Sequence, residues 1–142
     1  MSVEQNKSII RRWIEQGWNQ GNIAIVSELY AADVIQHDPS SPVRVNSAEA
    51  LKQYVTAFRS ALPDMRFSID DLLAEGDKVL WRFTAQGTHQ GVLLGIPATG
   101  RSATVTGMVE FRFANSKIVE VWVNFDSLGM MQQLGVIPMP NA

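Results

Sequence analysis

The polar side chains with the clearest chemical potential lie in one stretch, EVWVNFDSLGMMQQLG, from Glu120 to Gly135. Up to Asp126 the residues alternate, so that two acids, an amide and an indole share one parity and apolar side chains share the other. This period of two predicts a half-buried strand. Carboxylates and amides are costly to bury unless each finds a partner. We therefore expect the face of Glu120, Trp122, Asn124 and Asp126 to line a pocket.

Asp126 stands where the alternating pattern changes to helical spacing, which continues as far as Gly135. One interpretation is structural, because Asp is a favoured N-cap residue whose carboxylate accepts a hydrogen bond from a free backbone N–H of the first turn. The other interpretation is catalytic, with Asp126 as a general acid or base at the rim or floor of an apolar pocket. The sequence stretch by itself leaves both interpretations open.

His89 lies in a glycine-rich segment, GTHQGVLLGIPATGR, from Gly87 to Arg101. No helix start follows this segment, and no Lys is followed by Ser or Thr, so neither nucleotide-binding fingerprint applies. We expect a bent connection between two strands. His89 is then either a polar cap on that bend or a second polar group in the pocket, where it would donate to a developing enolate oxygen.

Further side chains are candidate substrate contacts around the same pocket. The hydroxyl group of Tyr54, on the buried face of a helix, could reach the pocket. His37 lies before a turn, where a surface role competes with a role in substrate binding. The aromatic side chains of the strands also suit a core, and as pocket walls they would exclude water. The expected substrate-binding residues are Trp18, His37, Tyr54, Trp81, Met108, Glu110, Trp122 and Asn124.

Composition limits the classes of partner and cofactor. A length of 142 residues predicts one domain, 1–142, with enough chain to bury a core. The net charge of −2, without a run of Lys and Arg, argues against nucleic acid. Cysteine is absent and the two histidines lie far apart, so we expect no metal site. The N-terminus lacks the apolar core of a signal peptide and no segment could span a bilayer, which predicts a cytoplasmic protein that does not use a membrane.

Apolar periodicity places the elements that must position these residues. Helical spacing predicts three N-terminal helices and a short C-terminal helix after Asp126. Short turns should make consecutive strands antiparallel neighbours, which gives an α+β domain with a curved antiparallel sheet around the helices and a cavity between them. The outward face of the last strand, with Val119, Val121, Val123 and Phe125, should contact another subunit. The predicted strands are Arg66–Ala74, Lys78–Thr88, Arg101–Phe113 and Lys117–Phe125.

Three motifs, GTHxGxxxGIPATGR, VEFRFANSKIVEVW and DSLGMMQQLG, resemble the SnoaL-like polyketide cyclases, and the likeness covers nearly the whole chain. The resemblance implies a cone-shaped α+β barrel that forms a homodimer or homotetramer. It also implies cofactor-independent acid/base chemistry, an intramolecular aldol-type cyclisation or an isomerisation, on a small hydrophobic carbonyl compound. Asp126 matches the aspartate that acts as acid and base in characterised members, and His89 matches the histidine before the GIPATG-like stretch.

The fold implied by the resemblance hosts unrelated tasks, so other functions remain open. The alternatives are a non-catalytic small-molecule-binding domain, a protein-interaction domain and an epoxide hydrolase-like enzyme. An enclosed cavity would favour a ligand, whereas a cavity filled by the protein's own side chains would favour the interaction domain. The epoxide hydrolase needs an Asp-Arg-Asp constellation, which the sequence does not place.

Overall fold

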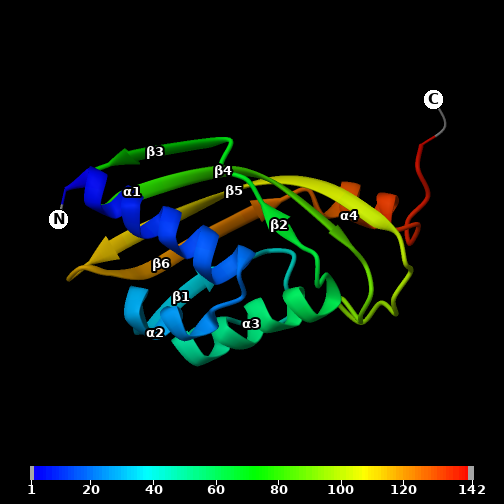
Figure 1. Cartoon of the computed structure of the whole chain (residues 1–142), viewed down its shortest axis with the longest axis horizontal. Helices are drawn as coiled ribbons and strands as arrows, with labels where there is room; N and C mark the ends of the chain where they lie inside the picture. Colours follow the sequence, from blue (N-terminus) through cyan, green and yellow to red (C-terminus); the bar gives the residue numbers. More distant parts are fainter. Residues whose placement is uncertain (1, 141–142) are drawn as a thin grey trace.

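Six strands form one mixed sheet in the computed structural model, which describes residues 2–140 (Figure 1). The order across the sheet is β1-β6-β5-β4-β2, and β3 pairs with β4 beside β2. The pairs β3–β4 and β5–β6 are antiparallel, as their short turns predict, and β4 and β5 are antiparallel as well. The strands are β1 (Tyr30–His37), β2 (Arg66–Phe67), β3 (Asp71–Glu75), β4 (Lys78–Thr88), β5 (Ser102–Ala114) and β6 (Lys117–Phe125).

The helices confirm the expected order of three N-terminal helical segments and one short C-terminal helix. The first three segments lie on one face of the sheet, whereas α4 follows β6 near one end of the sheet (Figure 1). Together with the sheet they make the α+β fold that was predicted. The helical segments are α1 (Val3–Arg12) with its π-helical continuation η1 (Trp13–Asn19), the 3-10 turn η2 (Ile23–Ile25) with α2 (Val26–Leu29), α3 (Ala48–Ala61) and α4 (Ser127–Gln133).

The change from α1 to the π-helix η1 brings two tryptophans together. Residues five apart lie about 140° from each other around an α-helix, so Trp13 and Trp18 would point in different directions. The π-helical i→i+5 hydrogen bonding brings such residues closer in angle. Both indoles are buried, and their ring centroids lie 6.1 Å apart. The first helix therefore presents an aromatic surface to the interior.

The parallel pairing of β1 with β6 corrects the expectation of a wholly antiparallel sheet. Gln36 lies opposite Val121 and His37 lies opposite Trp122 in this pairing. The hairpin with β5 occupies one edge of β6, and β1 covers the other edge. This contact spans more than eighty residues of sequence, so local patterns carry no signal for it.

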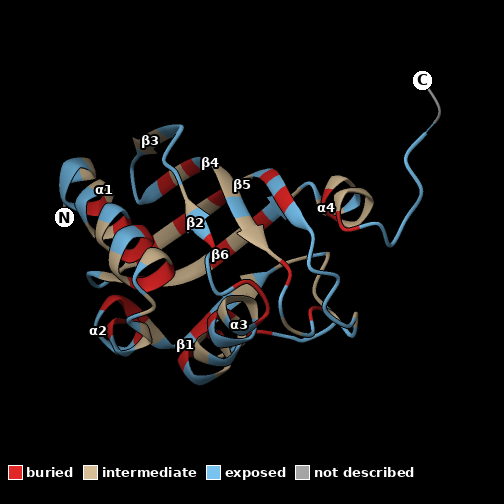
Figure 2. Cartoon of the chain, turned by 45° about the vertical axis from the view of Figure 1, so that its right-hand side comes forward, coloured by how far each residue is buried: buried red, intermediate tan, exposed pale blue. Residues whose placement is uncertain are grey.

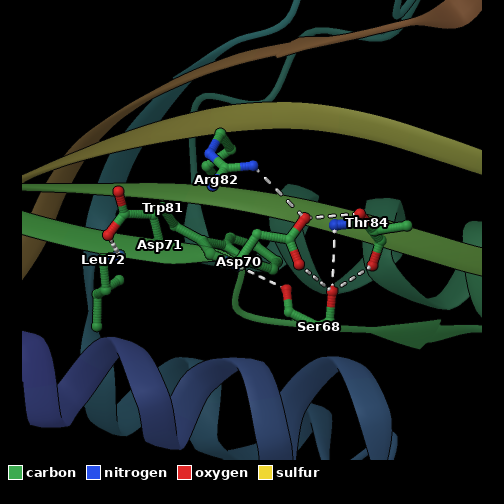
Figure 3. A network of polar contacts seen from close by, with 7 residues as sticks. All are labelled: Ser68, Asp70, Asp71, Leu72, Trp81, Arg82 and Thr84. Atoms are coloured by element: carbon green, nitrogen blue, oxygen red, sulfur yellow. Dashed lines mark hydrogen bonds and ion pairs between the residues drawn. The ribbon is translucent and has the colours of Figure 1, made fainter.

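The predicted strand Arg66–Ala74 is divided into β2 and β3 by a polar bend (Figure 3). Ser68 Oγ donates to Asp70 Oδ1 at 2.7 Å, and Thr84 Oγ1 donates to Asp70 Oδ2 at 2.6 Å. These side chains hold the bend to β4, because Ser68 N–H also donates to the Thr84 carbonyl at 2.9 Å. Their hydrogen bonds replace part of the regular strand pairing.

Along β4, β5 and β6, buried residues alternate with partly or fully exposed ones (Figure 2). On β6, Val121 and Val123 are buried with 1% and 8% of their surface exposed, so the aliphatic parity faces the helices. The expectation that this parity faces outward is wrong. Burial of apolar surface is the main driving force of folding, and the helices cover the concave face. The polar parity of β6 consequently lies on the outer face.

Candidate functional site

A cavity of about 90 Å³ lies between the helices and the concave face of the sheet. Its walls are mostly aromatic and aliphatic, and among the described residues its lining includes no Asp, Glu, His, Lys or Arg. The polar side chains in the lining are those of Tyr30, Gln36, Tyr54 and Gln86. The cavity can therefore accept an apolar molecule that needs few polar contacts.

Trp18, Tyr54 and Trp81 are the expected substrate-binding residues that line this cavity. The Trp18 ring lies 4.9 Å from the ring of Phe67 and 6.3 Å from that of Tyr54, between ring centroids. Trp81 Nε1 donates to the Ser68 carbonyl at 3.1 Å, so its one polar group is satisfied by the backbone. Both indoles thus present apolar ring surface to the cavity.

Gln36 contributes a polar group that the sequence analysis did not single out. Its side chain projects from β1 into the cavity lining, and its Nε2 atom is buried without a hydrogen-bond partner among residues 2–140. The backbone of Gln36 is satisfied, because its N–H donates to the Val45 carbonyl at 2.9 Å. A buried donor without a partner costs about 1–3 kcal/mol. A ligand with an acceptor oxygen would recover that cost.

Tyr54 brings a carboxylate to the edge of the cavity. Its hydroxyl donates to Asp38 Oδ2 at 2.7 Å, while Ser40 donates to Asp38 Oδ1 from its backbone N–H at 3.0 Å and from its hydroxyl at 2.6 Å. Burial raises the pKa of Tyr54 well above its ordinary value, and the charge and hydrogen bond of Asp38 add to that rise. Tyr54 is therefore a neutral phenol at physiological pH.

The alternation of side chains along β1 and just after it is the sequence pattern that could have identified Gln36 and Asp38. Val34, Gln36 and Asp38 have the same parity; Val34 is fully buried and Gln36 lines the cavity. The sequence DVIQHDP shows this alternation, but only the pairing of β1 with β6 turns that parity toward the helices. His37 has the opposite parity and lies on the outer face.

Met108, Glu110, Trp122, Asn124 and Asp126 are brought together, but on the outer face of the sheet. They line an open groove of about 610 Å³. The expectation that their face lines the enclosed cavity is wrong, for the same reason that the aliphatic parity of β6 faces inward. Met108 is 48% exposed in this groove rather than part of an apolar wall.

His37 joins the outer group through an aromatic and ionic cluster. Its ring stacks on Trp122 with centroids 5.4 Å apart, and its Nε2 lies 2.8 Å from Glu120 Oε2. Arg112 donates to Glu120 Oε1 from Nε at 3.2 Å and from a terminal nitrogen at 3.0 Å. The hydrogen bond from His37, followed by those from Arg112, lowers the pKa of Glu120. The donors around Glu120 explain how an acid is accommodated on this strand.

Asp126 is the N-cap of α4, as its structural interpretation predicts. Its Oδ1 accepts the Gly129 N–H at 2.9 Å, and the residue is exposed. A side chain at position 129 would collide with this carboxylate, so Gly129 leaves room for the cap. The catalytic role of Asp126 stays a prediction, and its carboxylate is absent from the cavity lining.

His89 is fully buried in the connection between β4 and β5. Its Nδ1 accepts the Thr99 N–H at 3.3 Å and lies 3.1 Å from Thr99 Oγ1, which assigns the ring hydrogen to Nε2. Its backbone bonds to Arg101 and Gly100 across the same connection. His89 thus holds the bend, and it is not among the residues that line the cavity. A role for His89 in a reaction stays a prediction.

Two further findings concern metals and membranes. Within residues 2–140, no three His, Asp or Glu side chains are grouped so that they could hold a metal ion. In the same part of the chain, no helix combines the length and apolarity needed to cross a membrane.

The sequence profile of the SnoaL-like polyketide cyclases matches residues 8–134. The chain belongs to this family. The match includes all six strands of the sheet and all the helices, apart from the start of α1. No curated protein matches the sequence.

Solved structures agree with membership of the SnoaL-like family. IdmH from Streptomyces antibioticus, described as a proposed polyketide cyclase, is 30% identical, with a TM-score of 0.77 and coverage of 93% of this chain and 99% of that chain. A SnoaL-like polyketide cyclase from Agrobacterium tumefaciens is 19% identical, with a TM-score of 0.78 and coverage of 95% and 100%. TsrD from Streptomyces laurentii is 24% identical, with a TM-score of 0.86 and coverage of 96% and 99%. The last two share the fold.

Proposed function

We propose that the protein binds a small, largely apolar carbonyl compound in the cavity of the concave face and polarises its carbonyl group, as part of a cyclisation or an isomerisation. The observation that carries this proposal is the buried, unpartnered Nε2 of Gln36 in an otherwise apolar lining. Membership of the SnoaL-like polyketide cyclase family supports the same class of compound.

The role of Gln36 follows from where charge develops. A donor near a carbonyl oxygen polarises the C=O bond and stabilises negative charge that grows on this oxygen during a reaction. Gln36 carries no charge, its backbone is held within the sheet, and its amide nitrogen is buried in the cavity lining. An interaction that strengthens as charge develops lowers the barrier rather than only tightening binding.

The size of the cavity indicates the scale of the compound. Its volume of about 90 Å³ is several times the roughly 10–15 Å³ needed for one water molecule. It is smaller than an engineered apolar cavity of about 150 Å³ that binds benzene, but it is partly open, so a one-ring compound can extend beyond it. One-ring carbonyl compounds are therefore suitable probes for the cavity.

A matched pair of probes, acetophenone and ethylbenzene, tests the proposal. Titration calorimetry should show that the protein prefers acetophenone, and that Gln36→Leu reduces this preference about 3- to 10-fold, the value of one ordinary hydrogen bond. Gln53→Leu, at an exposed position of α3, is the control and should keep the preference. Binding of neither probe, or an unchanged preference in Gln36→Leu, would overturn the proposal.

We also propose that the outer face of the sheet is the contact of a homodimer or homotetramer. Leu73 and Met108 are 56% and 48% exposed on this face, and Leu80 and Trp122 lie on the same side. Clusters of exposed apolar side chains are typical of subunit contacts. The interface is thus placed on the parity opposite to the one that the sequence pattern favoured.

A further inference from the structure

The hydroxyl of Tyr54 is a second polar group at the cavity, and its hydrogen is already used. Tyr54 donates to Asp38 Oδ2 at 2.7 Å. The Tyr54 ring is held between Phe58 and Trp18, with centroid distances of 5.0 and 6.3 Å. Because ring and hydroxyl are both fixed, the phenol cannot turn its O–H toward a ligand without losing the bond to Asp38.

Asp38 is itself fixed by the turn that follows β1. One carboxylate oxygen accepts two hydrogen bonds from Ser40, at 3.0 Å from the N–H and 2.6 Å from the hydroxyl. The other oxygen accepts the Tyr54 hydroxyl. Asp38 therefore has a stable position and a single orientation toward Tyr54.

A phenol that donates its hydrogen still has lone pairs that accept one. Tyr54 lines the cavity, so its oxygen is a candidate acceptor for a ligand there, and its bond to a carboxylate makes that oxygen a stronger acceptor. Gln36 lies near the end of β1 and Asp38 follows the strand two residues later, a spacing of about 7 Å in an extended chain. The residues that line the cavity consequently include a donor, Gln36, and an acceptor, Tyr54.

We propose that Tyr54, positioned by Asp38, accepts a hydrogen bond from a hydroxyl group of the ligand, so that the site selects compounds with both a carbonyl and a hydroxyl group. This inference rests on the proposed function, because it assumes that the carbonyl end is bound at Gln36. Asp38 is a positioning residue that acts through Tyr54. A simple apolar ketone would leave the Tyr54 oxygen without a donor, and this deficit gives the selectivity.

Two probes of the same size separate this inference from general binding. 4′-Hydroxyacetophenone carries both groups, whereas 4′-methylacetophenone replaces the hydroxyl with a methyl group. The measured quantity is the ratio of their affinities, by titration calorimetry. The wild type should prefer the hydroxyl compound, and Tyr54→Phe should reduce that preference about 3- to 10-fold. Asp38→Asn should lower it in the same direction by less, because Asn keeps an acceptor for Tyr54 without the charge.

Asp33→Asn, an exposed position on the same strand, is the matched control and should leave the ratio unchanged. Retained affinity for 4′-methylacetophenone shows that a variant is folded and that its cavity is intact. If Tyr54→Phe does not fold, Asp38→Asn decides the question by the same ratio. An unchanged ratio in the decisive variant overturns this inference while the proposed function stands. Failure of the wild type to bind either compound overturns both.

Discussion

Replacement of Asp126 by Ala and by Asn distinguishes a helix cap from a group that acts in the cavity. The carboxylate accepts one hydrogen bond, from the Gly129 N–H at 2.9 Å, and it is exposed. Asn offers the same kind of acceptor and caps helices about as well as Asp, whereas Ala offers none. Asp126→Asn therefore removes only the charge, whereas Asp126→Ala removes both the charge and the cap.

The magnitude follows from how α4 is held. Loss of an N-cap costs about 1 kcal/mol, within a range of about 0.5–2. The helix has other attachments, since Met130 and Leu134 are 4% and 1% exposed and the Gln133 side chain bonds to the Thr104 backbone at 2.7 and 2.9 Å. Asp126→Ala should therefore fray the first turn of α4 without releasing the helix. We expect a loss of about 1 kcal/mol in the free energy of unfolding and a fall of roughly 4 °C in Tm.

Urea unfolding and acetophenone titration together form the assay. Asp126→Asn should unfold like the wild type and bind acetophenone with the same affinity, because the carboxylate is not in the cavity lining. Equal destabilisation by Asn and Ala would refute the capping argument. A changed acetophenone affinity in Asp126→Asn would refute the separation from the cavity. Once a substrate is identified, a loss of turnover by about two orders of magnitude in Asp126→Asn would instead support a general base.

Two further predictions concern assembly and pH. Light scattering at micromolar concentration should show at least a dimer. Met108→Lys should shift the protein toward monomer, because it would place a charge in the apolar contact on the outer face. A monomeric wild type would contradict this interface. Burial raises the pKa of Tyr30 and of Tyr54, so their contribution to stability should be complete below pH of about 10 and be lost as the pH rises further. Urea unfolding should therefore show less alkaline loss in Tyr54→Phe than in the wild type, and an equal loss would contradict this account.

The strands β4 and β6 show how far local pattern reaches. Their predicted bounds, Lys78–Thr88 and Lys117–Phe125, agree with the structure, because the period of two is a property of neighbouring residues. The short turn between β5 and β6 is also local, and its residues Asn115 and Ser116 adopt positive φ of 52° and 65°. Helical spacing likewise predicted the buried faces of the first and third helices.

Tertiary structure decided which face of each strand became the interior. Alternation shows that a strand has two different faces, but it does not say on which side the helices pack. Helices on the concave face turned Val121 and Val123 inward and left Trp122 outside. The predicted pocket face therefore became the outer groove.

The sequence by itself determined the family and most of the elements, since these depend on motifs and on short-range periodicity, but it did not predict β1 or the division between β2 and β3. The cavity, by contrast, depends on β1, whose partner lies more than eighty residues away. That pairing directs Gln36 toward the cavity and sets Asp38 beside Tyr54. Long-range pairing is governed by which open edge and which apolar surface remain to be covered when the rest of the chain has folded. For this reason the residues with the clearest chemical pattern lay outside the cavity, and its polar contacts emerged only in three dimensions.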